Sequence, residues 1–223
     1  MLRKEIDMGT SRKYRTVVFA FAALFCGCFN PFFPPTGVPL SVDIGRSTPA
    51  GTVEQLFRAY QTRQINLFMD LFSPSKDFRF YVSPSFQADY AKERGGSATL
   101  ETIDSMFSYV RQTLGITEMY YWTYDDEIQL TNNMFTQAAD IGYSVDPQPI
   151  DTNAINYFKA PDGTQYAEVV VRGGELEIQV NTGDLTMVDY YIDIGVQVYY
   201  VERDPVHPSL WVIAKWFDLG TAQ

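Results

Sequence analysis

The chain of 223 residues has only two cysteines, Cys26 and Cys28, and none after them. Disulfides are therefore excluded from residues 29–223, so that part must be stabilised by burying apolar side chains. A bond between Cys26 and Cys28 is disfavoured because a one-residue spacer strains the ring. A zinc site at Cys-Gly-Cys would need further soft ligands, and the single histidine, His207, lies far along the sequence.

Basic residues are also scarce, with 17 Lys and Arg against 27 Asp and Glu. No stripe of basic residues is present, which excludes nucleic acid as a partner. No glycine-rich phosphate loop follows a predicted strand, and no pairing of a nucleophile with a base can be identified. We therefore expect no cofactor and no metal.

Long apolar runs are absent as well. Val17 to Phe25 is uncharged and apolar, which is about half of the roughly 20 residues that a membrane-spanning helix needs. Five basic residues precede it: Arg3, Lys4, Arg12, Lys13 and Arg15. This order of a positive start, a short apolar core and small residues is typical of a secretory signal that is removed.

The two cysteines follow this run in "LFCGCFNPFFPP", residues 24–35. Gly27 before Cys28 resembles the lipobox of bacterial lipoproteins, in which the cysteine is lipidated and becomes the mature N-terminus. The resemblance implies a signal peptide at residues 1–27 and membrane attachment through acylated Cys28. Phe29 rather than Asp follows, which by the envelope sorting rule favours the outer membrane, facing the periplasm. An ordinary signal peptide with soluble secretion is the alternative.

Residues 28–50 are rich in proline, which lacks a backbone donor, and they are predicted to form an extended tether. Residues 51–223 have a length that suits one domain. Removing residues 1–27 takes away five basic and two acidic residues, which changes the formal charge from −10 to −13.

The first part of that domain has helical spacing. Val53, Leu56, Phe57 and Tyr60 lie on one helix face, with Thr48 and Pro49 as N-cap and first-turn proline. A short second helix is predicted over 67–72, a strand over 78–82 and a third helix over 100–110.

The later part has strand patterns. We expect a strand at 118–130, a hairpin within 166–180 that turns at Gly173 and Gly174, and a strand at 187–203 paired with 210–219. Residues 131–165 are predicted to be a loop with some strand.

This order of elements resembles the NTF2-like superfamily, which includes nuclear transport factor 2, ketosteroid isomerase and the SnoaL-like cyclases. The resemblance rests on "TPAGTVEQLFRAYQTRQINLFMDLFSPSKDFRFYV", "GVQVYYVERD" and "LWVIAKWFDLG". It implies an α+β cone in which a strongly curved antiparallel sheet wraps around three N-terminal helices and leaves a pocket. Homodimers through the sheet face are a further implication of the resemblance.

The residues that could line such a pocket are Tyr60, Arg79, Tyr121, Asp193 and Trp216. Tyr60 also continues the core stripe of its helix, and Asp193 alternates with Asp189 and Tyr191 as on a solvated sheet face. The run Asp125 to Glu127 is interpreted as a charged strand end rather than a cation site. His207, between two prolines, is interpreted as a solvated turn residue.

Two functions remain open, together with a third possibility in which Phe and Tyr side chains fill the pocket and leave a structural module only. One is a non-catalytic envelope lipoprotein whose pocket or sheet face binds a small apolar ligand or another protein. The other is a SnoaL-like isomerase, cyclase or hydratase that acts on a small hydrophobic substrate. The side chains at the floor of the pocket would distinguish these two functions. Proton transfer needs a buried carboxylate with a hydrogen-bonding partner, whereas binding alone needs only an apolar lining.

Overall fold

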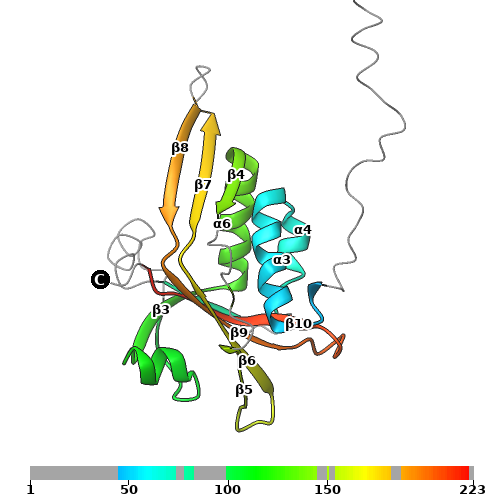
Figure 1. Ribbon diagram of the computed structural model, residues 1–223, viewed down its shortest axis with the longest axis vertical. Coiled ribbons are helices and arrows are strands. Elements are labelled where there is room, and N and C mark those ends of the chain that lie inside the picture. The colour runs from blue at the N-terminus through cyan, green and yellow to red at the C-terminus, as the bar shows by residue number, and fades with distance from the viewer. Residues whose placement is uncertain are drawn as a thin grey trace, which may run out of the picture. The chain divides into compact units, whose positions relative to one another are not determined.

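The computed structural model (Figure 1) describes residues 45–73, 78–82, 99–144, 150, 154–181 and 187–220. The chain divides into two compact units, 1–40 and 41–223, and only the second contains described residues. The predicted signal peptide, the lipidation site Cys28 and most of the tether therefore lie outside the described residues. Helices long and apolar enough to span a membrane are not found in the described ranges.

Helix α3 (Pro49–Thr62) begins as the sequence predicted. The Thr48 side chain accepts a hydrogen bond from the Gly51 N–H at 3.1 Å, and Pro49 occupies the first turn, where its missing N–H is not needed. Residues 45–50, which precede the predicted boundary at residue 51, are among the described residues. The Arg46 guanidinium lies 2.7 Å from the buried Asp204 carboxylate, which attaches the start of the domain to the β9–β10 turn.

The predicted short second helix is present as α4 (Ile65–Met69). The third predicted helix, over 100–110, is wrong in its bounds: this segment begins with a strand and ends in a π-helix, η1 (Tyr109–Thr113). The predicted strand over 118–130 is wrong beyond Thr123, because helix α6 (Tyr124–Gln137) starts there. Asp126 starts this helix by accepting hydrogen bonds from the backbone N–H and the hydroxyl of Thr123, at 3.0 and 2.7 Å.

Ten strands are described, and they form two sheets. A seven-stranded sheet has the order β2-β3-β1-β10-β9-β6-β5, and a three-stranded sheet has the order β4-β7-β8. Their bounds are β1 (Arg79–Tyr81), β2 (Thr99–Thr102), β3 (Glu118–Thr123), β4 (Ala138–Ser144), β5 (Asn156–Lys159), β6 (Gln165–Arg172), β7 (Glu175–Asn181), β8 (Met187–Asp193), β9 (Val196–Arg203) and β10 (Trp211–Asp218).

The α+β class is confirmed, but the large sheet is mixed rather than antiparallel. Strand β1 pairs with β10 in parallel, whereas the other pairs, including the predicted β9–β10 pair, are antiparallel. Strands β1 and β10, the first and last described strands, are neighbours in the middle of the sheet and run in the same direction. The three helices that cover it are α3, α4 and α6, so the third comes after β3 rather than before it.

The two sheets are joined by one long bent ribbon. The predicted hairpin at Gly173 and Gly174 is wrong, because β6 continues into β7 and both pair with the second ribbon strand, β8 followed by β9. The pairing continues through the bend: the Gly173 N–H donates to the Gly195 carbonyl at 2.7 Å and the Ile194 N–H to the Gly174 carbonyl at 3.0 Å. Gly173, Gly174 and Gly195 all have positive φ, which L side chains rarely adopt.

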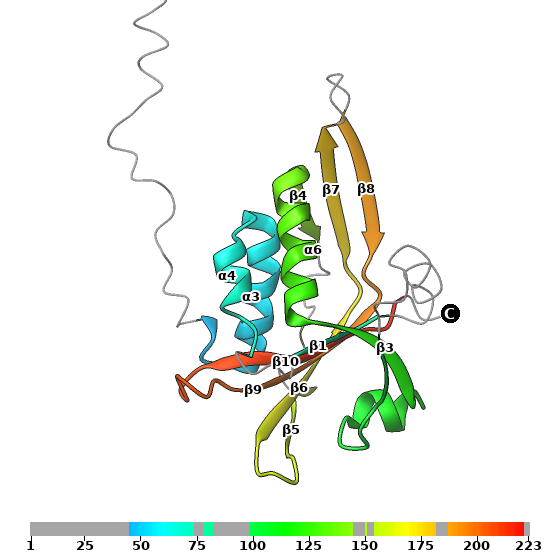
Figure 2. The ribbon, with the colours of Figure 1, turned by 180° about the vertical axis from the view of Figure 1, so that it is seen from behind.

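The middle strands of the seven-stranded sheet, β1, β10 and β9, are mostly buried, with side chains packed against both faces. Helices α3, α4 and α6 lie on one face, as the two opposite views show (Figures 1 and 2), and most of the core gathers beneath them. The other face carries a second cluster, in which Ile103, Phe107 and Val110 pack over Val198 and Tyr200 of β9. Part of the face that the resemblance assigned to dimer formation is thus covered by the chain itself, and the homodimer stays a prediction.

Candidate functional site

A cavity of about 350 Å³ lies between the helix-bearing face of the sheet, helices α3 and α6, and the bent ribbon. Its walls are mainly apolar, with a small set of polar groups among them. The lining residues are Leu56, Phe57, Tyr60, Phe80, Trp122, Glu127, Leu130, Thr131, Met134, Leu176, Ile192, Asp193, Ile194, Gln197, Tyr199, Trp216 and Asp218.

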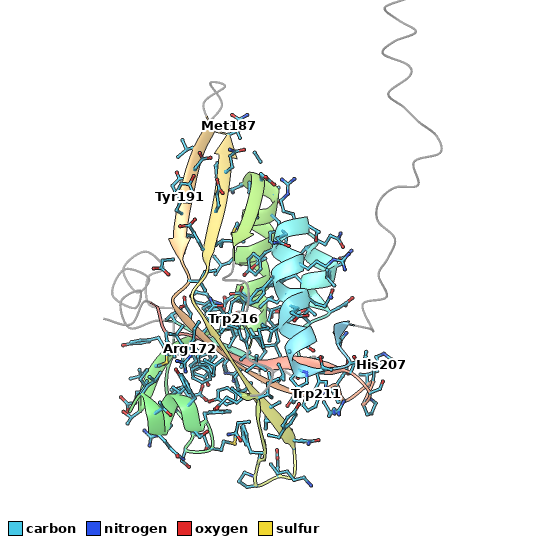
Figure 3. All side chains as sticks on the ribbon, viewed as in Figure 1. Arg172, Met187, Tyr191, His207, Trp211 and Trp216 are labelled. Atoms are coloured by element: carbon cyan, nitrogen blue, oxygen red, sulfur yellow. The ribbon has the colours of Figure 1, made fainter. Side chains whose placement is uncertain are left out.

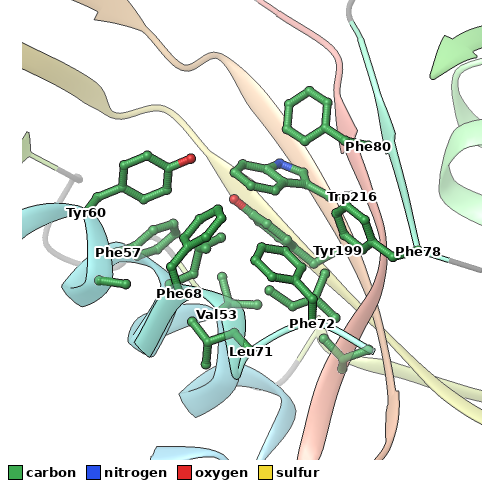
Figure 4. Packing of buried hydrophobic residues seen from close by; sticks show 14 of the residues in the cluster. Val53, Phe57, Tyr60, Phe68, Leu71, Phe72, Phe78, Phe80, Tyr199 and Trp216 are labelled. Atoms are coloured by element: carbon green, nitrogen blue, oxygen red, sulfur yellow. The ribbon is translucent and has the colours of Figure 1, made fainter. Parts of the chain in front are cut away.

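The sheet side of the cavity carries a row of aromatic rings across four neighbouring strands. The register places Trp122 of β3 beside Phe80 of β1, Phe80 beside Trp216 of β10, and Trp216 beside Tyr199 of β9. Phe80 stacks on Trp122 with ring centroids 4.4 Å apart, and its edge meets Trp216 at 4.5 Å. Figure 4 shows Phe80, Trp216 and Tyr199 side by side opposite the residues of α3. These mutually packed rings form a rigid wall.

The carboxyl group of Glu127 is fully enclosed on the α6 side. One carboxyl oxygen accepts the indole N–H of Trp122 at 2.6 Å, and the other accepts the hydroxyl of Thr131 at 3.0 Å. Burial raises the pKa of Glu127 to about 7; the two hydrogen bonds oppose the rise, and the charges of Asp126 and Asp218 add to it. Glu127 therefore exchanges its proton near neutral pH, within an apolar cavity.

A second carboxyl group, Asp218, lies at the end of β10. Its side chain accepts the backbone N–H of Gly220 at 3.0 Å. Burial raises the pKa of Asp218 to about 6, which the bond from Gly220 partly offsets. Because Asp218 adds to the raised pKa of Glu127, the two carboxyl groups lie within electrostatic reach of each other.

The indole N–H of Trp216 is the third polar feature of the cavity. Trp216 is only 4% exposed, and its Nε1 finds no hydrogen-bond partner among the described residues. Such a buried donor costs free energy unless an acceptor reaches it. In Figure 4 the hydroxyl of Tyr60 points from α3 toward this indole ring. On the neighbouring strand, the hydroxyl of Tyr199 donates to the Gln197 side chain.

The predicted pocket residues divide into two groups. Tyr60, Asp193 and Trp216 line the cavity. Arg79 and Tyr121 do not: side chains alternate along a strand, so these two face the opposite side of the sheet from Phe80 and Trp122. There the Arg79 guanidinium lies 4.6 Å from the centre of the Tyr121 ring.

Asp193 lies at the bend, where its carboxylate accepts the Gly195 N–H at 3.0 Å. His207 is exposed in the β9–β10 turn, far from Trp216 in Figure 3.

Sequence reasoning did not select Glu127 or Asp218. Glu127 was assigned to a charged strand end, although Thr123 followed three residues later by Asp126 is a helix-start signal. With that start, Glu127 and Thr131 are four residues apart on one helix face, which is the spacing that joins them. Asp218 shares a strand face with Trp216, but nothing in the sequence indicates that this strand end is covered.

The polar groups of the cavity suit hydrogen bonding and proton exchange. Within the described ranges, no three His, Cys, Asp or Glu side chains are grouped as metal ligands. The cavity thus has an apolar interior, a free N–H donor and two carboxyl groups that titrate near neutral pH.

Comparison with known proteins gives similarity of structure alone. No protein-family model matches the chain, and no curated protein matches its sequence. Among solved structures, an NTF2-like superfamily protein from Salmonella enterica is 11% identical, over 77% of this chain and 87% of that one, with a TM-score of 0.45.

A ketosteroid isomerase-like protein from Erwinia carotovora is 10% identical, over 81% of this chain and 95% of that one, with a TM-score of 0.37. An NTF2-like protein from Shewanella oneidensis is 13% identical, over 78% and 94%, with a TM-score of 0.32. The chain is similar in its arrangement of elements to NTF2-like proteins, the superfamily that its sequence resembles.

Proposed function

We propose that the described domain binds a small, mostly apolar molecule in the cavity beneath α3 and α6. The proposal rests on a partly open cavity of about 350 Å³ that has mainly apolar walls and a few polar groups, including a buried indole N–H with no partner among the described residues. A ligand oxygen that accepts from Trp216 would remove the cost of that buried donor.

The first experiment is native mass spectrometry of the full chain purified from its own host, which shows any molecule that copurifies. The site is checked with Leu130→Trp, which fills the cavity from the α6 side. Leu114→Trp is the matched control, because Leu114 is exposed and does not line the cavity. We expect a bound species that Leu130→Trp removes and Leu114→Trp retains. A chain that is always empty, or a ligand that Leu130→Trp retains, contradicts the proposal.

A second candidate function is proton transfer on the bound molecule, as in an isomerase, cyclase or hydratase. The specific observation is Glu127, whose pKa is raised to about 7, close to the best value for a general base at neutral pH. In this scheme Glu127 takes a proton from a carbon next to a ligand carbonyl, and the Trp216 N–H stabilises the oxyanion that forms.

This candidate is tested by deuterium exchange into simple cyclic enones in D₂O, followed by NMR. Catalysed exchange that Glu127→Gln abolishes supports it. If the protein binds the enone but does not accelerate exchange, the binding function stands alone.

We further propose that a lipid on Cys28 holds the domain at the bacterial outer membrane, on its periplasmic side. Support comes from the sequence order of basic start, apolar run, Gly27 and Cys28. Several acyl chains together would hold it stably, since each buried methylene contributes about 0.8 kcal/mol.

Mass spectrometry of the mature N-terminal peptide, together with membrane fractionation, tests this. Cys28→Ser should abolish the lipid and release the protein, whereas Cys26→Ser, two positions away, should leave both unchanged. A mature N-terminus without lipid would instead support ordinary secretion.

A further inference from the structure

We propose that the cavity selects a ligand carrying a protonated amine beside an oxygen acceptor, in preference to neutral or anionic molecules of the same shape. The inference rests on the proposed ligand-binding function and adds the charge of the ligand to it.

The charges at the cavity all have one sign. Its described lining includes the carboxyl groups of Glu127, Asp193 and Asp218, and no lysine, arginine or histidine. Arg79, whose strand crosses the cavity floor, faces the opposite side of the sheet. An anionic ligand would therefore bring further negative charge into a poorly solvated space without a counterion. A cation would instead relieve the repulsion between Glu127 and Asp218.

The walls suit a cation as well. Six aromatic side chains line the cavity, and the π-faces of such rings attract an ammonium group once it leaves water. These are Phe57, Tyr60, Phe80, Trp122, Tyr199 and Trp216. Trp216 and Asp218 lie two residues apart on β10 and both line the cavity, so an aromatic ring and a carboxylate are available side by side.

The N–H of Trp216 requires a different group. It is buried and has no acceptor among the described residues. An ammonium group has only donors and cannot satisfy it. A hydroxyl or carbonyl oxygen of the ligand would satisfy it. Because Trp216 and Asp218 lie two residues apart on β10, that oxygen would lie close to the amine, which points to an amino alcohol or amino ketone on an apolar body.

The test uses three probes with the same phenyl body and benzylic hydroxyl group. 2-Amino-1-phenylethanol carries the amine, 1-phenylethane-1,2-diol has a hydroxyl in place of the amine, and mandelic acid has a carboxylate in place of the whole aminomethyl group. Dissociation constants are measured on the full chain by isothermal titration at neutral pH. We expect the amine to bind at least about tenfold more tightly than the diol, and mandelate not to bind.

Variants assign the preference to the cavity. Asp218→Asn and Glu127→Gln keep the shape of each side chain and remove its charge, so each should reduce the ratio of amine to diol affinity severalfold. Glu54→Gln, at an exposed position of α3, controls for general attraction to an acidic protein and should leave the ratio unchanged. Thermal melts confirm that each variant is folded.

The outcomes separate the two proposals. If the diol binds as well as the amine, or if Glu54→Gln reduces the ratio as much as Asp218→Asn does, the charge inference is overturned while ligand binding stands. If none of the probes binds and no host molecule copurifies, both are overturned.

Discussion

Replacing Glu127 by glutamine should change how the stability of the fold depends on pH. Burial raises the pKa of this carboxyl from 4.5 to about 7. A rise of about 2.5 in pKa, at about 1.4 kcal/mol for each pKa unit, sets an upper limit of about 3.5 kcal/mol. The unfolded chain loses the proton at lower pH than the folded chain does. The stability that the protonated group provides is therefore complete below pH 4.5 and is lost as the pH rises to about 7.

Glutamine keeps the geometry of the protonated form. Its carbonyl oxygen can accept from Trp122, and its amide can donate to the Thr131 hydroxyl, so both contacts of Glu127 are retained. We expect the wild type and Glu127→Gln to be similar in free energy of unfolding at pH 5. At pH 8.5 the variant should be more stable by about 2 to 3 kcal/mol.

The measurement is urea unfolding followed by tryptophan fluorescence at pH 5, 6, 7 and 8.5. Asp218, whose pKa burial also raises, is present in both proteins, so most of its own contribution cancels when wild type is compared with the variant. Glu54→Gln serves as the exposed control and should follow the wild type throughout. A difference between wild type and Glu127→Gln that is the same at pH 5 and pH 8.5 would refute a proton held near neutrality at this site.

Three further predictions concern the fold itself and are checked by unfolding midpoints at pH 7. Arg46→Met should destabilise by about 3 kcal/mol, because it leaves the buried carboxylate of Asp204 without its ion pair, and Asp204→Asn in the same chain should recover part of the loss. Gly173→Ala should cost about 1 kcal/mol through its φ of 74° alone, since a Cβ there meets no atom within 4 Å. Gly142→Ala, whose Cβ would make ordinary contact with Glu177, is its control and should be neutral or slightly stabilising. Phe68→Ala should cost about 3 to 5 kcal/mol, because its fully buried ring packs against other core aromatics; a smaller loss would mean that the core collapses around the gap.

The predictions from sequence succeeded where the signal was local. Thr48 and Pro49 mark the start of α3 through contacts within one helical turn. The pairing of β9 with β10 follows from a short turn between two apolar strands. Both depend on neighbours in the chain, and both were predicted correctly.

The errors came where two local signals competed. The aromatic run before residue 124 favours a strand, and the predicted strand wrongly continues into the acidic residues that start α6. Paired glycines at 173 and 174 are typical of a tight turn, but a continuous partner strand holds them in a bend instead. The choice between turn and bend depends on strand β8–β9, some twenty residues further along.

By itself, the sequence determined the acidic charge, the α+β class, the first helix and the pair of C-terminal strands, because composition and short-range periodicity carry that information. Only the tertiary structure decided which polar side chains are buried together. Trp216 becomes a donor without a partner among the described residues, and the pKa values of Glu127 and Asp218 rise, because elements distant in sequence close over them. Desolvation of this kind is a property of the whole packing, and it has no counterpart in any short stretch of residues.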